Sequence, residues 1–216
     1  MSDLIYTDGA CSGNGTSRAT GGFGIYIAKS CFSDSEIKIN KKGNEITKIN
    51  SDHIKNDFYI TNIRMEGLAI AYTLMLYADQ YVFDKKIIDP VKHLNSYNMD
   101  LNGYKLFYIQ DELKLGELKN KKIEIVTDSL FWMNVIQTWM PNWIRKNILL
   151  EKKNPDILLM LNYYNTLLTQ NGVEVVYTHV KSHQLKKRTV HADGNDVADV
   201  LATSAVKNKD YKFTNV

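Results

Sequence analysis

Three acidic residues stand where the sequence could bring carboxylates together around a metal ion. Asp8 ends a strand-like segment in YTDGACSGNG, and Asp128 ends a β-branched segment in IEIVTDS. Glu66 lies in the first turns of a helix-like segment, TNIRMEGLAIA. In an open α/β sheet, the carboxyl ends of strands and the adjacent helix starts face one crevice. If the two strands are parallel neighbours, Asp8 and Asp128 lie side by side and Glu66 reaches in from the helix.

Such a cluster implies metal-dependent phosphoryl chemistry. Three carboxylates at one point repel each other, and a cation is the usual means of joining them. Oxygen ligands without histidine or thiolate favour Mg²⁺ or Mn²⁺ over zinc. Two such ions can stabilise the attacking and the leaving oxygen of an in-line displacement, and Asp8 is the candidate for the bridging carboxylate. Taken singly, each acid could instead be a helix cap or a first-turn acid, so the inference rests on the combination.

The strands that would position these acids are short apolar runs. Residues 3–8 and 22–28 flank a glycine-rich stretch from Gly9 to Gly22, which can turn tightly and bring backbone close to a ligand. Further strands are predicted at 36–39 and 45–49, as a hairpin around Lys42-Gly43-Asn44, and at 57–60, 122–127 and 173–180.

Helical periodicity marks the segments between and after these strands. Apolar residues from Met65 to Leu76 recur at helical spacing, and Thr61 or Asn62 can cap the start. Early strands with short links predict an antiparallel meander, which later strands separated by helices should join in parallel. We therefore expect an α/β fold, a mixed sheet with helices on both faces. The other predicted helices span 129–138, 155–170 and 193–206.

Length and composition suit one domain of 216 residues with an insertion at about 79–119, a polar stretch that breaks the pattern. Hydrophobic residues at 44% and charged residues at 24% are ordinary for a globular protein, and a net charge of +3 indicates little by itself. Cys11 and Cys31 form no zinc-like pattern. Without a visible targeting signal or an apolar stretch near the ~20 residues of a membrane span, we expect an intracellular, soluble protein, cytoplasmic or nuclear.

Five motifs, taken in order, resemble those of the type 1 ribonuclease H family. They are TDGACSGNG, TNIRMEGLAIA, IVTDS, THVKSH and GNDVADVLA, and the match covers residues 3–78 and 121–206. The resemblance implies a ribonuclease H-like mixed five-stranded sheet, three antiparallel strands plus two parallel, in a single catalytic domain over residues 1–216. It also implies an endonuclease that hydrolyses the RNA strand of RNA–DNA hybrids with two Mg²⁺ ions, replaceable by Mn²⁺, and without an obligatory protein partner.

Within this resemblance the three acids named above fill three of four metal-binding positions. Asp193, Asp196 and Asp199 compete for the fourth, and the family pattern Gly-Asn-acid-x-x-Asp-x-x-Ala, placed on residues 194–202, selects Asp199. His183, in VKSH, matches the histidine of a mobile loop. Its implied role is proton transfer near the attacking water, or assistance to product release, because an imidazole can act either way at neutral pH.

The resemblance assigns substrate contacts to the glycine-rich turn and the helix start. Asn14 and Thr61 match positions that bind a DNA-strand phosphate, although a turn residue and a helix cap would look the same. Backbone groups of residues 9–14, with Asn62, match groups that contact RNA 2′-hydroxyls. Trp139 matches a region of substrate binding, or serves as a core anchor. The substrate-binding candidates are Gly9, Cys11, Gly13, Asn14, Thr61, Asn62 and Trp139.

Two departures from the family pattern bear on specificity. Leu130 follows the Asp-Ser pair where relatives often carry an amide, and Ile63 stands where a polar residue is common. Both changes weaken the expected recognition of 2′-hydroxyls. A nuclease of relaxed specificity on the same fold, or a non-catalytic nucleic-acid-binding module, therefore remains the alternative to a strict hybrid-cutting enzyme.

Overall fold

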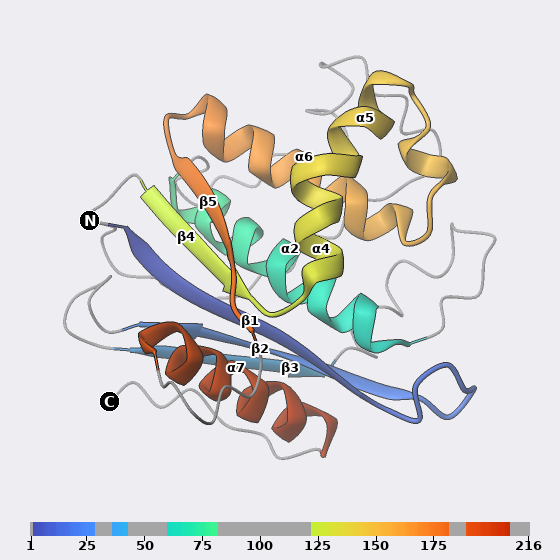
Figure 1. Cartoon of the computed structure of the whole chain (residues 1–216), viewed down its shortest axis with the longest axis vertical. Helices are drawn as coiled ribbons and strands as arrows, with labels where there is room; N and C mark the ends of the chain where they lie inside the picture. The colour runs from blue at the N-terminus through green and yellow to red at the C-terminus, as the bar shows by residue number, and fades with distance from the viewer. Residues whose placement is uncertain (1, 29–35, 43–59, 82–121, 182–188, 208–216) are drawn as a thin grey trace.

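Five strands form one mixed sheet in the order β3-β2-β1-β4-β5 (Figure 1). The structure is a computed structural model that describes residues 2–28, 36–42, 60–81, 122–181 and 189–207. Strand β1 pairs antiparallel with β2, which pairs antiparallel with β3, whereas β4 and β5 continue the sheet in parallel. This is the predicted mixed sheet. The strands are β1 (Asp3–Ser12), β2 (Thr20–Ile27), β3 (Ile37–Lys42), β4 (Lys122–Thr127) and β5 (Glu174–His179).

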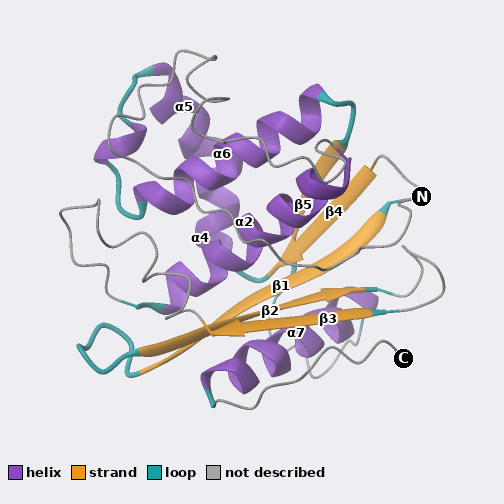
Figure 2. Cartoon of the chain, turned by 180° about the vertical axis from the view of Figure 1, so that it is seen from behind, coloured by secondary structure: helices purple, strands orange, loops and turns teal. Residues whose placement is uncertain are grey.

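Helices cover both faces of the sheet, as the two opposite views show (Figures 1 and 2). Helix α7 packs on β1, β2 and β3, whereas α2 packs on the other face and is itself covered by α6. A π-helical turn, η1, joins α4 to α5. Within the described residues no helix combines the length and apolar character of a membrane span. The helical segments are α2 (Asn62–Tyr81), α4 (Leu130–Asn134), η1 (Val135–Trp139), α5 (Met140–Arg145), η2 (Leu149–Glu151), α6 (Pro155–Gln170) and α7 (Val190–Val206).

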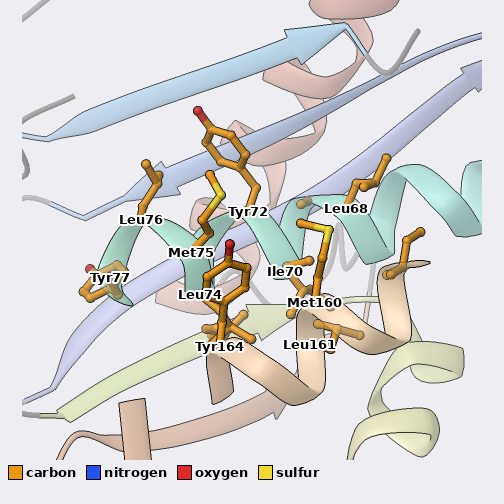
Figure 3. Close-up of a cluster of buried hydrophobic side chains, with 14 of the residues drawn as sticks. Leu68, Ile70, Tyr72, Leu74, Met75, Leu76, Tyr77, Met160, Leu161 and Tyr164 are labelled. Carbon is orange, nitrogen blue, oxygen red and sulfur yellow. The ribbon is translucent and has the colours of Figure 1, made fainter. Parts of the chain in front are cut away.

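Helix α2 is the centre of the core. Nearly every side chain from Met65 to Ala78 is buried, as expected for a helix that packs against a sheet on one side and a second helix on the other. Figure 3 shows Ile70 and Leu74 of α2 beside Met160 and Tyr164 of α6, whereas Tyr72 points towards the sheet, where its ring lies 5.5 Å from that of Phe23. Because α2 is held by apolar contacts on several sides, its first turns have a defined place beside the sheet.

Several elements differ in extent from the prediction. Strand β1 continues to Ser12 because residues 9–12 pair with residues 20–23 of β2, so the glycine-rich stretch turns only in residues 13–19. Helix α7 begins three residues early, where the Thr189 hydroxyl accepts from the Ala192 amide.

Other predicted segments lie wholly or partly outside the described residues. The 45–49 strand does, and so does the 57–60 strand except for Ile60, which is not in a strand. The proposed insertion falls outside as well, apart from residues 79–81, which belong to α2.

Candidate active site

Asp8 and Asp128 directly follow the last paired residues of two parallel, neighbouring strands. Strands β1 and β4 pair from Asp3 and Ile123 up to Thr7 and Thr127, so the next residue of each chain is an aspartate on the same side of the ladder. Asp8 is only 7% exposed, and the Gly9 amide donates to its Oδ1 at 2.7 Å. The predicted proximity of these two carboxylates therefore follows directly from strand register.

Glu66 is presented by the second turn of α2. The Thr61 hydroxyl caps this helix by accepting from the Arg64 amide at 3.2 Å. The helix approaches β1 closely at Gly9, which has no side chain. A Cβ built on Gly9 would lie only 2.2 Å from the Glu66 backbone nitrogen. Two donors orient the Glu66 carboxylate: Asn62 Nδ2 lies 2.6 Å from Oε1, and Ser129 Oγ lies 2.5 Å from Oε2.

Asp199 comes from the opposite face of the sheet, on α7. That helix approaches β2 at Gly24, where an added Cβ would lie 2.3 Å from the Ala198 carbonyl oxygen. One turn before Asp199, the buried Asn195 amide hydrogen bonds the Asp128 side chain. Asp199 acts electrostatically on both Asp8 and Asp128, as expected if it is the fourth member of the cluster.

The carboxyl groups of the cluster are buried or half-buried and lie close to one another, and both conditions disfavour their ionised forms. Burial and then the charge of Asp128 raise the pKa of Asp8 from 3.8 to about 8, with Asp199 and Glu66 adding to the effect. Burial also raises the pKa of Glu66 and of Asp128, against the lowering effect of their hydrogen-bond donors. Without a cation, Asp8 therefore favours its protonated form at neutral pH.

The donor set suits a hard divalent cation, because four carboxylates supply only oxygen ligands. Among the described residues, however, no three His, Cys, Asp or Glu side chains are already gathered as a closed ligand set. A buried acceptor beside the cluster, Asn195 Oδ1, has no hydrogen-bond partner among the residues that the structure describes. The charges of Asp128, Asp199 and Glu66 all act on Asp8, so the four carboxyl groups lie in one neighbourhood.

The predicted substrate residues of the turn gather at the start of α2. Asn14 Oδ1 accepts from the Asn62 amide at 3.2 Å, and Cys11 Sγ lies 3.6 Å from the Ile60 carbonyl oxygen. Gly13 has a φ of 66°, within a turn that the Thr16 amide closes. The β1–β2 turn is therefore tied to the helix that carries Glu66, and the Asn62 side chain contacts Glu66 as well.

Trp139 is the last residue of η1. Its ring is 38% exposed and stands 5.8 Å from the ring of Phe131 and 6.1 Å from that of Trp143, measured between centroids. Trp139 is therefore neither a buried core anchor nor a fully solvated side chain. His183 lies outside the described residues.

Three neighbours of the cluster were not singled out from the sequence. Ser129 and Asn195 hydrogen bond Glu66 and Asp128, respectively. His179 Nε2 lies 3.2 Å from the Asp128 carbonyl oxygen, at the end of β5. Of these three, only Ser129 could have been found from the sequence. A serine at the start of a predicted helix, directly after a candidate metal ligand, can cap the helix and contact the site.

Comparison with known proteins finds similarity to ribonucleases H. A family model described as RNase H matches residues 106–207, a span that contains Asp128 and Asp199. A Ribonuclease H from Stutzerimonas stutzeri (strain A1501) is 36% identical over 93 residues, which cover 43% of this chain and 57% of that protein. A Ribonuclease H from Orientia tsutsugamushi (strain Boryong) is 24% identical over 204 residues, which cover 93% of this chain and 79% of that protein.

Two solved structures share the fold. LC9-RNase H1, described as a type 1 RNase H with the type 2 active-site motif, gives a TM-score of 0.54 at 14% identity, over 100% of this chain and 79% of that one. The PFV RNase H domain gives a TM-score of 0.51 at 17% identity, over 95% and 94%. At these identities the likeness concerns the fold alone. Asp8 and Glu66, which precede the span of the family model, join Asp128 through the sheet and α2.

Proposed function

We propose that this chain, which is similar to RNase H proteins by family model, by relatives and by fold, is a ribonuclease H, an endonuclease that hydrolyses the RNA strand of RNA–DNA hybrids. The observation that carries the proposal is the convergence of four carboxylates from four separate elements. Asp8 comes from β1 and Glu66 from α2, Asp128 follows β4, and Asp199 comes from α7. Three of them have raised pKa values, and burial is the largest cause in each case.

The four carboxylates are the proposed ligands of two Mg²⁺ ions, with Mn²⁺ as a possible substitute and Asp8 as the bridging ligand. Bound divalent ions supply activation of the attacking water and stabilisation of the leaving oxygen. The chain's own residues prepare this site. Asn62 and Ser129 hold the two oxygens of Glu66, and Asn195 holds Asp128. Asp8, which holds a proton at neutral pH without metal, would have to release it to serve as a ligand.

Substrate contacts are proposed for the β1–β2 turn and the start of α2. Backbone groups of residues 9–14 and Asn62 would read the RNA 2′-hydroxyls, while Asn14 and Thr61 would take a phosphate of the DNA strand. Trp139 offers an exposed ring to the same substrate. His183 is proposed to transfer a proton near the attacking water or to assist product release.

Residues 1–216 are proposed to form one catalytic domain interrupted at about 79–119. An RNA–DNA hybrid is the proposed partner, and no obligatory protein partner is invoked. Such a substrate implies an intracellular place of action, cytoplasmic or nuclear.

A second candidate function is favoured by the surface beside the cluster. Ile63 is 41% exposed and Leu130 is 58% exposed, three residues before Glu66 and two after Asp128. These apolar side chains offer no hydrogen bond to a ribose hydroxyl. A nuclease of relaxed specificity on the same fold is therefore the alternative. A non-catalytic binding module is disfavoured because all four carboxylates are present.

Substrate choice separates these functions. The test offers the purified protein four labelled substrates of one sequence: an RNA–DNA hybrid, single-stranded RNA, duplex RNA and duplex DNA, each with Mg²⁺ and with Mn²⁺. Internal cuts confined to the hybrid's RNA strand support the proposed function. Equal cutting of the other substrates supports the relaxed nuclease, and hybrid binding without any cutting supports the binding module.

A further inference from the structure

A buried ion pair joins the first turn of α2 to the start of α6. Arg64 is 2% exposed and Asp156 is 6% exposed. The guanidinium makes two parallel contacts with the carboxylate: Nη1 lies 3.1 Å from Oδ1, and Nη2 lies 2.6 Å from Oδ2. A bidentate pair of this kind fixes the relative orientation of the two groups as well as their distance, because two parallel N–H···O contacts hold them edge to edge.

The start of α6 is shaped to receive this contact. Asn154 has a φ of 59° and a ψ of 50°, the left-handed conformation, and its Oδ1 accepts from Arg64 Nη1 at 2.9 Å. Pro155 then opens the helix, which places Asp156 in the first turn, where a carboxylate is favoured by the helix dipole. Arg64 therefore meets two acceptors from one rigid corner of α6.

The opposite side of α2 carries the candidate site. Arg64 and Glu66 are two positions apart, and at about 100° per residue their side chains leave α2 on nearly opposite sides. Repulsion by the charge of Asp128 would push Glu66, and with it the start of α2, towards α6. The apolar contacts of α2 resist separation, but they resist sliding and rotation less than a directional contact does.

Stability alone is a weak reason for such a pair. Removing two charges from water costs much of what their attraction returns, and an apolar pair of similar size is often as stable. We propose that Arg64, held by Asp156 and Asn154, is a positioning residue that sets the place of Glu66 in the metal site. The inference rests on the proposed function and adds to it a part of the chain that touches neither metal nor substrate.

The main test replaces the ion pair by an apolar pair, Arg64→Met with Asp156→Leu, which keeps the packing volume and leaves no unpaired charge. Arg64→Lys is the second variant, because it keeps the charge but loses the fork. The matched control is Glu174→Gln, which breaks the exposed Lys122–Glu174 pair at the far end of β4 and β5. For each protein we would measure Tm, kcat and KM on the hybrid, and the Mg²⁺ concentration that half-saturates the rise in Tm.

A positioning role predicts a particular pattern. The apolar pair should keep Tm within a few degrees, while kcat falls and the half-saturating Mg²⁺ concentration rises, each by roughly 10- to 100-fold, with KM little changed. Arg64→Lys should fall between this variant and the wild type, and the control should match the wild type. If the variant with the apolar pair does not fold, kcat and the half-saturating Mg²⁺ concentration of Arg64→Lys alone test the positioning role.

The proposal is overturned if these variants keep the wild-type kcat and Mg²⁺ dependence, whatever their Tm. That result leaves the ribonuclease activity intact and is therefore distinct from failure of the proposed function. In that second case the wild-type protein itself would not cut the hybrid.

Discussion

Ser129 Oγ lies 2.5 Å from Glu66 Oε2 and so joins the end of β4 to the first turns of α2. The same oxygen accepts from the Trp132 amide at 3.4 Å and caps α4. Trp132 in turn donates through Nε1 to the Ile63 carbonyl oxygen at 2.6 Å. One small side chain thus serves the candidate site and the local structure together, beside the aspartate that precedes it.

Ser129→Ala is expected to lower kcat by roughly 10- to 100-fold and to destabilise the fold by about 1 kcal/mol, through loss of the helix cap. The hydroxyl donates to the carboxylate and lowers the pKa of Glu66, so its removal raises that pKa. The rising limb of the pH–rate profile should therefore move to higher pH. Ser129→Thr, which keeps the hydroxyl, is the control, and an unshifted profile in the alanine variant would count against this role.

Asp8→Asn should change how stability depends on pH. The pKa of Asp8 is 3.8 ordinarily and about 8 in the fold, so the metal-free folded state holds the proton more tightly than the unfolded chain. Stability supplied by the protonated group is complete below pH 4 and is lost as pH rises towards 8. The variant lacks this loss and should be more stable than the wild type at pH 8–9 by about 5 kcal/mol, because each tenfold change in proton affinity is worth about 1.4 kcal/mol. The Tm of the variant should be higher by roughly 10 °C or more.

Thermal unfolding in chelator from pH 5 to 9 measures this difference. Added Mg²⁺ should raise the Tm of the wild type most at high pH, where the carboxylates are free to bind it, and should leave the variant almost unchanged. If the Tm of the two proteins depends on pH in the same way, the pKa of Asp8 is not raised in the fold.

Asn195→Ala should weaken metal binding more than it weakens the fold. The amide lowers the pKa of Asp128, so its loss favours the protonated carboxyl group and should raise the half-saturating Mg²⁺ concentration by roughly tenfold. Ser204→Ala removes another buried polar group of α7, one that donates to the Val200 carbonyl oxygen. Calorimetric titration with Mg²⁺ should separate the two variants; equal affinities would refute the assignment.

Gly9→Ala tests the close approach of β1 to α2. The added Cβ would stand 2.2 Å from the Glu66 backbone nitrogen, and a helix backbone cannot move aside as a flexible side chain can. We expect a loss of about 1–3 kcal/mol in the free energy of unfolding together with a fall in kcat, because Glu66 is pushed away from Asp8. Ala10→Ser, one residue along the strand, is the control. Unchanged denaturant unfolding in the glycine variant would show that the approach is not tight.

Much of the sheet and the carboxylate cluster could be predicted because local pattern and chain order carry them. The β-branched run before Asp128 and the apolar run before Asp8 predicted two strands. Their parallel register then places both acids directly after the last paired residues. The extent of β1 could not be read locally, because residues 9–12 become strand only through pairing with β2. Periodicity says nothing about a partner strand.

The supporting contacts were harder to anticipate because they join residues distant in the sequence. Arg64 and Asp156 are 92 positions apart, and the Glu66–Ser129 contact spans 63 positions. Each residue alone looks like an ordinary helix residue or cap. The π-helical turn that carries Trp139 is likewise set by packing, since the sequence of η1 differs little from that of a regular helix.

Cleavage of an end-labelled RNA–DNA hybrid by the wild type, Asp128→Asn and Glu124→Gln is the most direct test of the central claim. Glu124 is the matched acid, because it lies on the same strand, β4, but bonds the Thr178 hydroxyl of β5 instead of facing the cluster. We expect internal cuts in the RNA strand by the wild type and Glu124→Gln with Mg²⁺, none in chelator, and a rate at least roughly 100-fold lower for Asp128→Asn. Cutting that persists in chelator, or that Asp128→Asn retains at the wild-type rate, would contradict the central claim.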